Sequence, residues 1–154
     1  MIKIVAVSDN HGDLDGIKQI LNDNPNADYY FHLGDNCQDS SLIKPFCSIR
    51  GNNDYDINLP DYRVIEIGEN NKVFLIHGHQ FSFNMNGLVK EAKNRGCNII
   101  IFGHTHLFHN SIIDGVHIIN PGSCFYNRDM SPCCYAKITI NNNDISVERV
   151  NLSI

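Results

Sequence analysis

The sequence has no tryptophan and no long hydrophobic run. Of its 154 residues, 42% are hydrophobic and 19% are charged, which is typical of a globular protein and not of a disordered or fibrous one. Its longest apolar runs, such as residues 73–76 and 98–102, fall far short of the ~20 residues that span a bilayer. The length fits one domain over residues 1–154. We therefore expect no contact with membranes.

The sequence also lacks an excess of basic residues. Twelve lysines and arginines stand against 17 acidic residues, for a net charge of −5. Proteins that bind nucleic acid without sequence preference carry a basic face, so the charge argues against nucleic acid as a partner. The first residues run directly into a strand-like segment and leave no room for a signal peptide, so we expect a cytoplasmic protein.

No C-x-x-C pair occurs among the six cysteines. Small secreted domains use such a number of cysteines for disulfides, but the apolar content here supports a core without them. We interpret the cysteines as reduced thiols that pack as small apolar residues. They are Cys37, Cys47, Cys97, Cys124, Cys133 and Cys134.

The hydrophobic pattern predicts an α/β fold. Residues 2–7 and 98–102 are continuous apolar runs, as in strands covered on both faces. Asp13 can cap a helix with an apolar stripe, and residues 87–95 form a second predicted helix that ends at Gly96. Other predicted strands cover residues 28–33, 46–50, 63–67 and 72–76, with hairpins over 111–119 and 135–150. The pattern indicates a partly parallel sheet early and antiparallel strands late.

Polar residues follow five of the predicted strands directly. They are Asp9 and His11 after residues 2–7, Asp35 after 28–33, Asn52 and Asp54 after 46–50, His77 and His79 after 72–76, and His104 and His106 after 98–102. The carboxyl ends of strands are where open α/β sheets bind ligands. Carboxylate, amide and imidazole groups suit first-row transition ions. The sequence therefore predicts a metal site at this edge.

Each of these residues has a simpler interpretation when taken alone. Asp9 is an ordinary helix cap, Gly34-Asp35 is an ordinary turn, and asparagine in turns tolerates positive φ. His104 and His106 are more informative, because residues i and i+2 of extended backbone project to one side. For the site to be absent, every one of these simple interpretations would have to hold at the same sheet edge. We therefore favour the metal site. We interpret His32, His109 and His117, which lie outside the pattern, as structural or surface residues.

The ordered motifs resemble the calcineurin-like metallophosphoesterases. Within them the chain is most similar to the small YfcE-like phosphodiesterases, from residue 2 to about residue 150. The motifs that carry the resemblance are Asp9-x-His11, Gly34-Asp35, Gly51-Asn52-x-Asp54, His77-Gly78-His79, Gly103-His104-Thr105-His106 and the turn Asn120-Pro121-Gly122-Ser123. The resemblance implies a four-layer α/β/β/α sandwich with mixed sheets around two metal ions.

The resemblance also implies a ligand set. The first metal takes Asp9, His11 and His106, the second takes Asn52, His77 and His104, and Asp35 bridges the two with a water or hydroxide. Asp35, Asn52, His77 and His104 are expected to act in catalysis as well. His79 is expected beside the ligands, and Asp54 is expected to orient a ligand or a loop.

Two dications would lower the pKa of the bridging water and hold both oxygens of an in-line displacement at phosphorus. They would also attract the phosphate ester and stabilise its transition state. We expect Mn²⁺, with Fe, Zn²⁺ or Ni²⁺ as alternatives. Many relatives have a histidine that assists the leaving group after the asparagine of the third motif. Asn53 stands there in this chain and cannot act as a general acid near neutral pH.

The resulting hypothesis is a metal-dependent phosphodiesterase that hydrolyses small phosphate esters, with a homo-oligomer left open. A phosphomonoesterase is one alternative, because the metals alone do not decide between mono- and diesters. A non-catalytic scaffold is another, since the retromer subunit with this fold resembles these enzymes and acts mainly as an assembly platform. A nuclease is disfavoured by the acidic charge. All seven ligand positions carry competent side chains, which favours an enzyme.

Overall fold

The computed structural model describes residues 1–81 and 83–153. Its strands are β1 (Ile2–Val7), β2 (Tyr29–His32), β3 (Cys47–Ser48), β4 (Tyr62–Ile67), β5 (Asn71–Ile76), β6 (Ile99–Phe102), β7 (Phe108–Ile113), β8 (Val116–Pro121), β9 (Cys134–Asn141) and β10 (Asp144–Asn151). Its helices are α1 (Asp15–Asp23), the short 3₁₀ helix η1 (Ser40–Ile43) and α2 (Met85–Asn94). No helix in these two ranges is long and apolar enough to cross a membrane.

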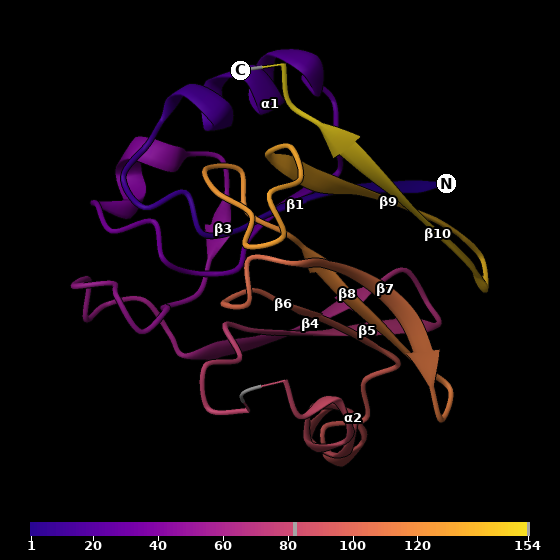
Figure 1. The fold of residues 1–154 in the computed structure, drawn as a ribbon. Coiled ribbons are helices and arrows are strands. Elements are labelled where there is room, and N and C mark those ends of the chain that lie inside the picture. Colours follow the sequence, from indigo (N-terminus) through magenta and orange to yellow (C-terminus); the bar gives the residue numbers. More distant parts are fainter. Residues whose placement is uncertain (82, 154) are drawn as a thin grey trace.

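The strands form two five-stranded mixed sheets. The first has the order β10-β9-β1-β2-β3 and the second has the order β4-β5-β6-β8-β7. The two sheets pack face to face, with α1 outside the first and α2 outside the second (Figure 1). This arrangement confirms the predicted four-layer α/β/β/α sandwich with mixed sheets.

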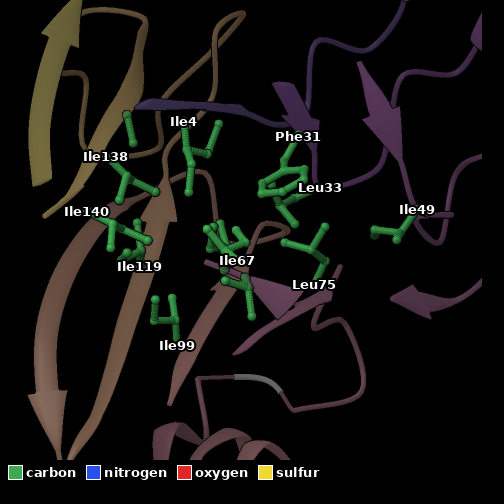
Figure 2. Close-up of a cluster of buried hydrophobic side chains, with 14 residues drawn as sticks. Ile4, Phe31, Leu33, Ile49, Ile67, Leu75, Ile99, Ile119, Ile138 and Ile140 are labelled. Atoms are coloured by element: carbon green, nitrogen blue, oxygen red, sulfur yellow. The ribbon is translucent and has the colours of Figure 1, made fainter. Parts of the chain in front are cut away.

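The main core lies between the two sheets. Figure 2 shows isoleucines of β1 and β9 facing those of β6 and β8. Ile4, Ile99 and Ile138 are each about 1% exposed. Two further clusters fill the outer layers, one between β1 and α1 around Val7 and Ile20, and one between β5, β6 and α2. Burial of these apolar surfaces fixes the strand ends that carry the polar residues.

The parallel strands bring their carboxyl ends to the same edges. β1 pairs in parallel with β2, while β6 pairs in parallel with both β5 and β8. The segments after β1, β2, β5 and β6 therefore leave the two sheets beside one another, as the sequence predicted.

Several element boundaries differ from the predicted ones. β3 contains only two residues. Two residues after it, the amide of Arg50 donates to the carbonyl of Pro60 and no longer pairs with β2. α2 begins at Met85, two residues early, where the side chain of Asn84 accepts from the amide of Gly87. It still ends before Gly96, which has the left-handed φ of +70°. Asp13 accepts from the amide of Asp15 at the start of α1.

Candidate metal centre

Five of the predicted ligands converge between the ends of β1, β2, β5 and β6. The Nε2 atom of His11 lies 3.8 Å from Oδ1 of Asp9, 3.7 Å from Oδ2 of Asp35 and 3.3 Å from Nε2 of His106. The Nε2 atom of His77 lies 3.4 Å from Oδ2 of Asp35 and 3.8 Å from Oδ1 of Asp9. Each of the two carboxylates thus lies within 3.8 Å of both His11 and His77.

Two groups within this cluster have the spacing of a cation site. One is Asp9, His11 and His106, which is the set predicted for the first metal. The other is Asp9, Asp35 and His77. Asp9 belongs to both groups, whereas the resemblance assigned it to the first metal and made Asp35 the bridge. The ligand assignment as a whole remains a prediction.

The backbone at the cluster is strained. Asp9, His11, Asp35, His104 and His106 have φ values between +44° and +69°, a left-handed region that residues other than glycine seldom adopt. Such conformations persist where the surrounding structure holds them, and they cluster at functional sites. Five of the ten non-glycine residues with positive φ in the described parts of the chain are therefore predicted ligands.

Two buried polar atoms of the cluster have no hydrogen-bond partner. These are Oδ1 of Asp9 and Nε2 of His77, which face each other at 3.8 Å. An unsatisfied buried polar atom costs free energy unless a partner is supplied. A cation between a carboxylate oxygen and an imidazole nitrogen would satisfy both atoms.

Backbone carbonyls orient two of the imidazoles. Nδ1 of His77 lies 2.6 Å from the carbonyl oxygen of Leu33, and Nδ1 of His106 lies 2.7 Å from that of Tyr126. A carbonyl only accepts, so each ring carries its proton on Nδ1 and directs the Nε2 lone pair into the cluster. Metal-binding histidines are commonly fixed in this way.

The polar contacts around Asp9 hold its carboxylate in place. Its Oδ2 accepts from the hydroxyl of Ser8 and, at 3.0 Å, from the amide of His104. The hydroxyl of Ser123 donates to the Asp9 carbonyl at 2.8 Å. Gly103 lies so close that a side chain there would collide with Ser8 and Asp9. Contacts from three loops therefore fix Asp9, two of them at its carboxylate and one at its backbone carbonyl.

The electrostatics favour two ionised carboxylates. Burial alone would raise the pKa of Asp9, but its contacts with His106 and His77 outweigh burial and lower that pKa. The pKa of Asp35 is likewise lowered, because its contacts with His77 and Asn53 outweigh burial. Two negative charges facing the same imidazoles repel one another, which a bound cation would relieve.

The third motif organises the loop that carries Asp35. The Asp54 carboxylate accepts from the amides of Asp35, Cys37 and Gly51 at 2.7–2.8 Å, so Asp54 orients this loop as predicted. Asn53 donates to Asp35 from its amide and its side chain, both at 2.9 Å. Asn52, the predicted ligand, lies between Gly51 and Asn53 with an exposed side chain.

The remaining histidines divide into two groups. The rings of His104 and His79 lie beside His77, with centroids at 5.2 and 5.7 Å, so both border the cluster. His32 is fully buried and hydrogen-bonds to Asn10 and to the amide of Gly34. His109 and His117 bond to neighbouring polar side chains on β7. These last three are structural, as predicted.

Three residues near the cluster were not predicted. Sγ of Cys37 lies 3.6 Å from Nδ1 of His11, and only its position two residues after Asp35 could have indicated this. The rings of Phe125 and Tyr126 lie near His11 and His106. The signal in the sequence was an aromatic pair directly after Asn120-Pro121-Gly122-Ser123 and Cys124.

The residues fit divalent metal ions. Carboxylate oxygens and imidazole nitrogens are the donors that first-row transition ions take. The unpartnered Asp9 and His77 atoms and the carbonyl-bound Nδ1 atoms point these donors inward. The cluster thus supplies lone pairs and negative charge where a cation requires them.

Comparison with known proteins agrees with this chemistry. Residues 2–143 match the calcineurin-like phosphoesterase superfamily domain. A probable metallophosphoesterase of Mycoplasma pneumoniae is 30% identical over 130 residues, covering 80% of this chain and 79% of the relative. A phosphodiesterase of Methanocaldococcus jannaschii is 32% identical over 147 residues, covering 80% and 84%.

Solved structures share the fold. A predicted phosphoesterase of Streptococcus pneumoniae superposes with a TM-score of 0.88 at 28% identity, over 97% of this chain and 89% of that chain. Vps29 of Entamoeba histolytica superposes with a TM-score of 0.79 at 22% identity, over 99% and 100%. At this identity, the Vps29 likeness concerns the fold alone.

Proposed function

Because the chain belongs to the calcineurin-like phosphoesterase superfamily, we propose that it is a phosphodiesterase that acts on small phosphate esters at a dinuclear metal centre. Metal-dependent hydrolysis of phosphoric esters follows from the family. The diester preference, the two-metal arrangement and the ligand set are the proposal. The diester preference draws support from the M. jannaschii relative, which is named a phosphodiesterase.

One observation carries the proposal. Oδ1 of Asp9 and Nε2 of His77 are buried, have no hydrogen-bond partner and lie 3.8 Å apart within the cluster. A structural hydrogen-bond network would pair such atoms, whereas a metal site leaves them free for the ion. The proposed first ligand set is Asp9, His11 and His106, and the second is Asn52, His77 and His104 with Asp35 shared.

The side chains have separate tasks in this mechanism. When bound, divalent ions supply charge neutralisation and an activated water for attack on phosphorus. Asp9 and Asp35 remain ionised and set the charge of the site, while Leu33 and Tyr126 hold His77 and His106 in the ligating tautomer. Asn53 fixes Asp35 but offers no acidic proton to a leaving group. The enzyme should therefore favour esters with good leaving groups.

The test measures hydrolysis of bis-p-nitrophenyl phosphate and p-nitrophenyl phosphate with Mn²⁺. We expect wild type to hydrolyse the diester faster and Asp35→Ala to lose at least ~100-fold in kcat/KM, since even residues that support ligands contribute 10–100-fold. Equal, negligible rates for wild type and Asp35→Ala would refute the assignment of the protein as an enzyme. Equal rates for both esters would refute only the diester preference. Repeating the assay with Fe²⁺, Zn²⁺ and Ni²⁺ identifies the most effective metal.

A non-catalytic scaffold is the second candidate, because the chain shares its fold with Vps29, a vacuolar protein sorting protein. The strained backbone at five predicted ligands argues against it. The unpartnered buried atoms of Asp9 and His77 also favour a metal site over a surface that only assembles with other proteins.

A further inference from the structure

Two half-exposed aromatic side chains border the metal centre. Phe125 is 47% exposed and Tyr126 is 51% exposed, and both lie in the loop between β8 and β9, drawn in orange in Figure 1. The Phe125 ring centroid is 6.4 Å from that of His11, and the Tyr126 ring meets His106 edge-on at 6.3 Å. Large aromatic surface left in water beside a polar site is typical of ligand contact.

Hydrogen bonds of the loop fix the backbone of these two residues relative to the ligands. The Ser123 hydroxyl accepts from the amides of Phe125 and Tyr126 at 3.0 and 2.8 Å and donates to the Asp9 carbonyl. The Tyr126 carbonyl bonds to Nδ1 of His106. The same hydrogen bonds thus orient the ligands and place the rings.

We propose that Phe125 and Tyr126 form a subsite for an aromatic group on the phosphate ester, either a nucleobase or an aryl ring. The Phe125 and Tyr126 rings have their centroids 6.4 and 6.3 Å from those of His11 and His106, so the substituent of an ester whose phosphate binds at these histidines lies beside the two rings. Aromatic rings interact favourably by stacking or edge-to-face contact and need no hydrogen bonds. This inference rests on the proposed phosphoesterase site and specifies its substrate class.

Calorimetric binding of phosphate esters to the Mn²⁺-loaded protein tests the subsite. The probes form two pairs, and in each pair only the first member carries an aromatic group. The first pair is phenyl phosphate and methyl phosphate, and the second is adenosine 5′-monophosphate and ribose 5-phosphate. We expect about tenfold tighter binding of the aromatic member, the order of one stacking contact. An advantage in the first pair alone indicates aryl esters, and one in the second indicates nucleotides.

Variants locate the effect. In Phe125→Leu and Tyr126→Leu the ratio of affinities should fall toward one, whereas Tyr62→Leu, which removes a half-exposed aromatic on β4, should retain it. An equal affinity within both pairs, or a ratio unchanged in both loop variants, would overturn the subsite. Failure of any phosphate to bind would overturn it as well. Hydrolysis of bis-p-nitrophenyl phosphate by a protein without the aromatic preference would leave the proposed function standing and remove only the subsite.

Discussion

The carboxylates of Asp9 and Asp35 dominate the centre at the scale of single residues. Both are at most 2% exposed, and both face His11 and His77 within 3.8 Å. Burying two like charges together is unfavourable unless cations compensate them. The metal should therefore contribute to the stability of the protein as well as to hydrolysis.

Mn²⁺ should raise the melting temperature of wild type and not that of Asp35→Asn. An ion at 100 times its dissociation constant adds about 2.7 kcal/mol, which corresponds to roughly 5–10 °C for a domain of this size. The variant loses a ligand and also the ionised carboxylate that His77 and Asn53 stabilise, so its metal-free melting temperature should fall below that of wild type. Thermal denaturation with Mn²⁺ or EDTA measures both effects. Asp144→Asn, at the exposed first residue of β10, should respond as wild type does.

Asn53→His should change the dependence of the rate on the leaving group. Asn53 lies against Asp35, and a histidine there can protonate a departing oxygen, which asparagine cannot. We expect kcat/KM for phenyl esters to rise about tenfold relative to p-nitrophenyl esters. Asn53→Ala serves as the control because it removes the hydrogen bond without adding an acid. Parallel changes for both leaving groups would contradict a role in protonation.

The loops after the strands are the decisive elements. Each one carries a glycine close to a ligand: a side chain at Gly34 would come within 2.7 Å of Nδ1 of His77, and one at Gly103 would collide with Ser8. These contacts explain why a glycine precedes so many of the ligands. The sequence predicted the strand ends and their polar residues, because apolar runs and following glycines are local signals.

The sequence could not predict the features that depend on distant contacts. β3 is short because Arg50 bonds to Pro60, and the position of Phe125 depends on Ser123 reaching Asp9. The left-handed backbone of Asp9 and Asp35 is likewise imposed by tertiary packing and contradicts local preference. The motifs thus identified the residues, while tertiary contacts determined their geometry.

Gly103→Ala should weaken metal binding more than it weakens the fold. A methyl group there collides with the Ser8 hydroxyl and the Asp9 carboxylate and displaces both, and overpacking of this kind costs about 1–3 kcal/mol. Gly115→Ala is the matched control: its φ of +79° makes alanine strained by about 1–2 kcal/mol, yet nothing lies within 4 Å. Urea unfolding should show comparable losses for both variants. Mn²⁺ affinity should fall only in Gly103→Ala, and an equal loss of affinity in the two would contradict the close-packing argument.

At the scale of the whole molecule, the sandwich buries polar groups together with its apolar layers. His32 lies on β2 with no exposed surface, its ring edge-on to Phe46 in the layer beneath α1. It hydrogen-bonds to Asn10 and Gly34 and so connects the loops after β1 and β2. The first sheet therefore depends on a neutral imidazole.

Acid should destabilise the protein through His32. Burial disfavours its charged form and lowers its pKa from 6.5 to about 4. Between these pH values the unfolded chain binds a proton at His32 and the folded chain does not. The contribution of neutral His32 to the free energy of unfolding is therefore fully present above pH 6.5 and is lost as the pH falls toward 4. A difference of this size corresponds to about 3 kcal/mol. Urea unfolding in EDTA from pH 7.5 to 4 measures it. His32→Gln, which retains a hydrogen-bonding side chain but does not titrate, should lose that much less stability over the same range, and an identical pH dependence in the two proteins would contradict a neutral buried His32.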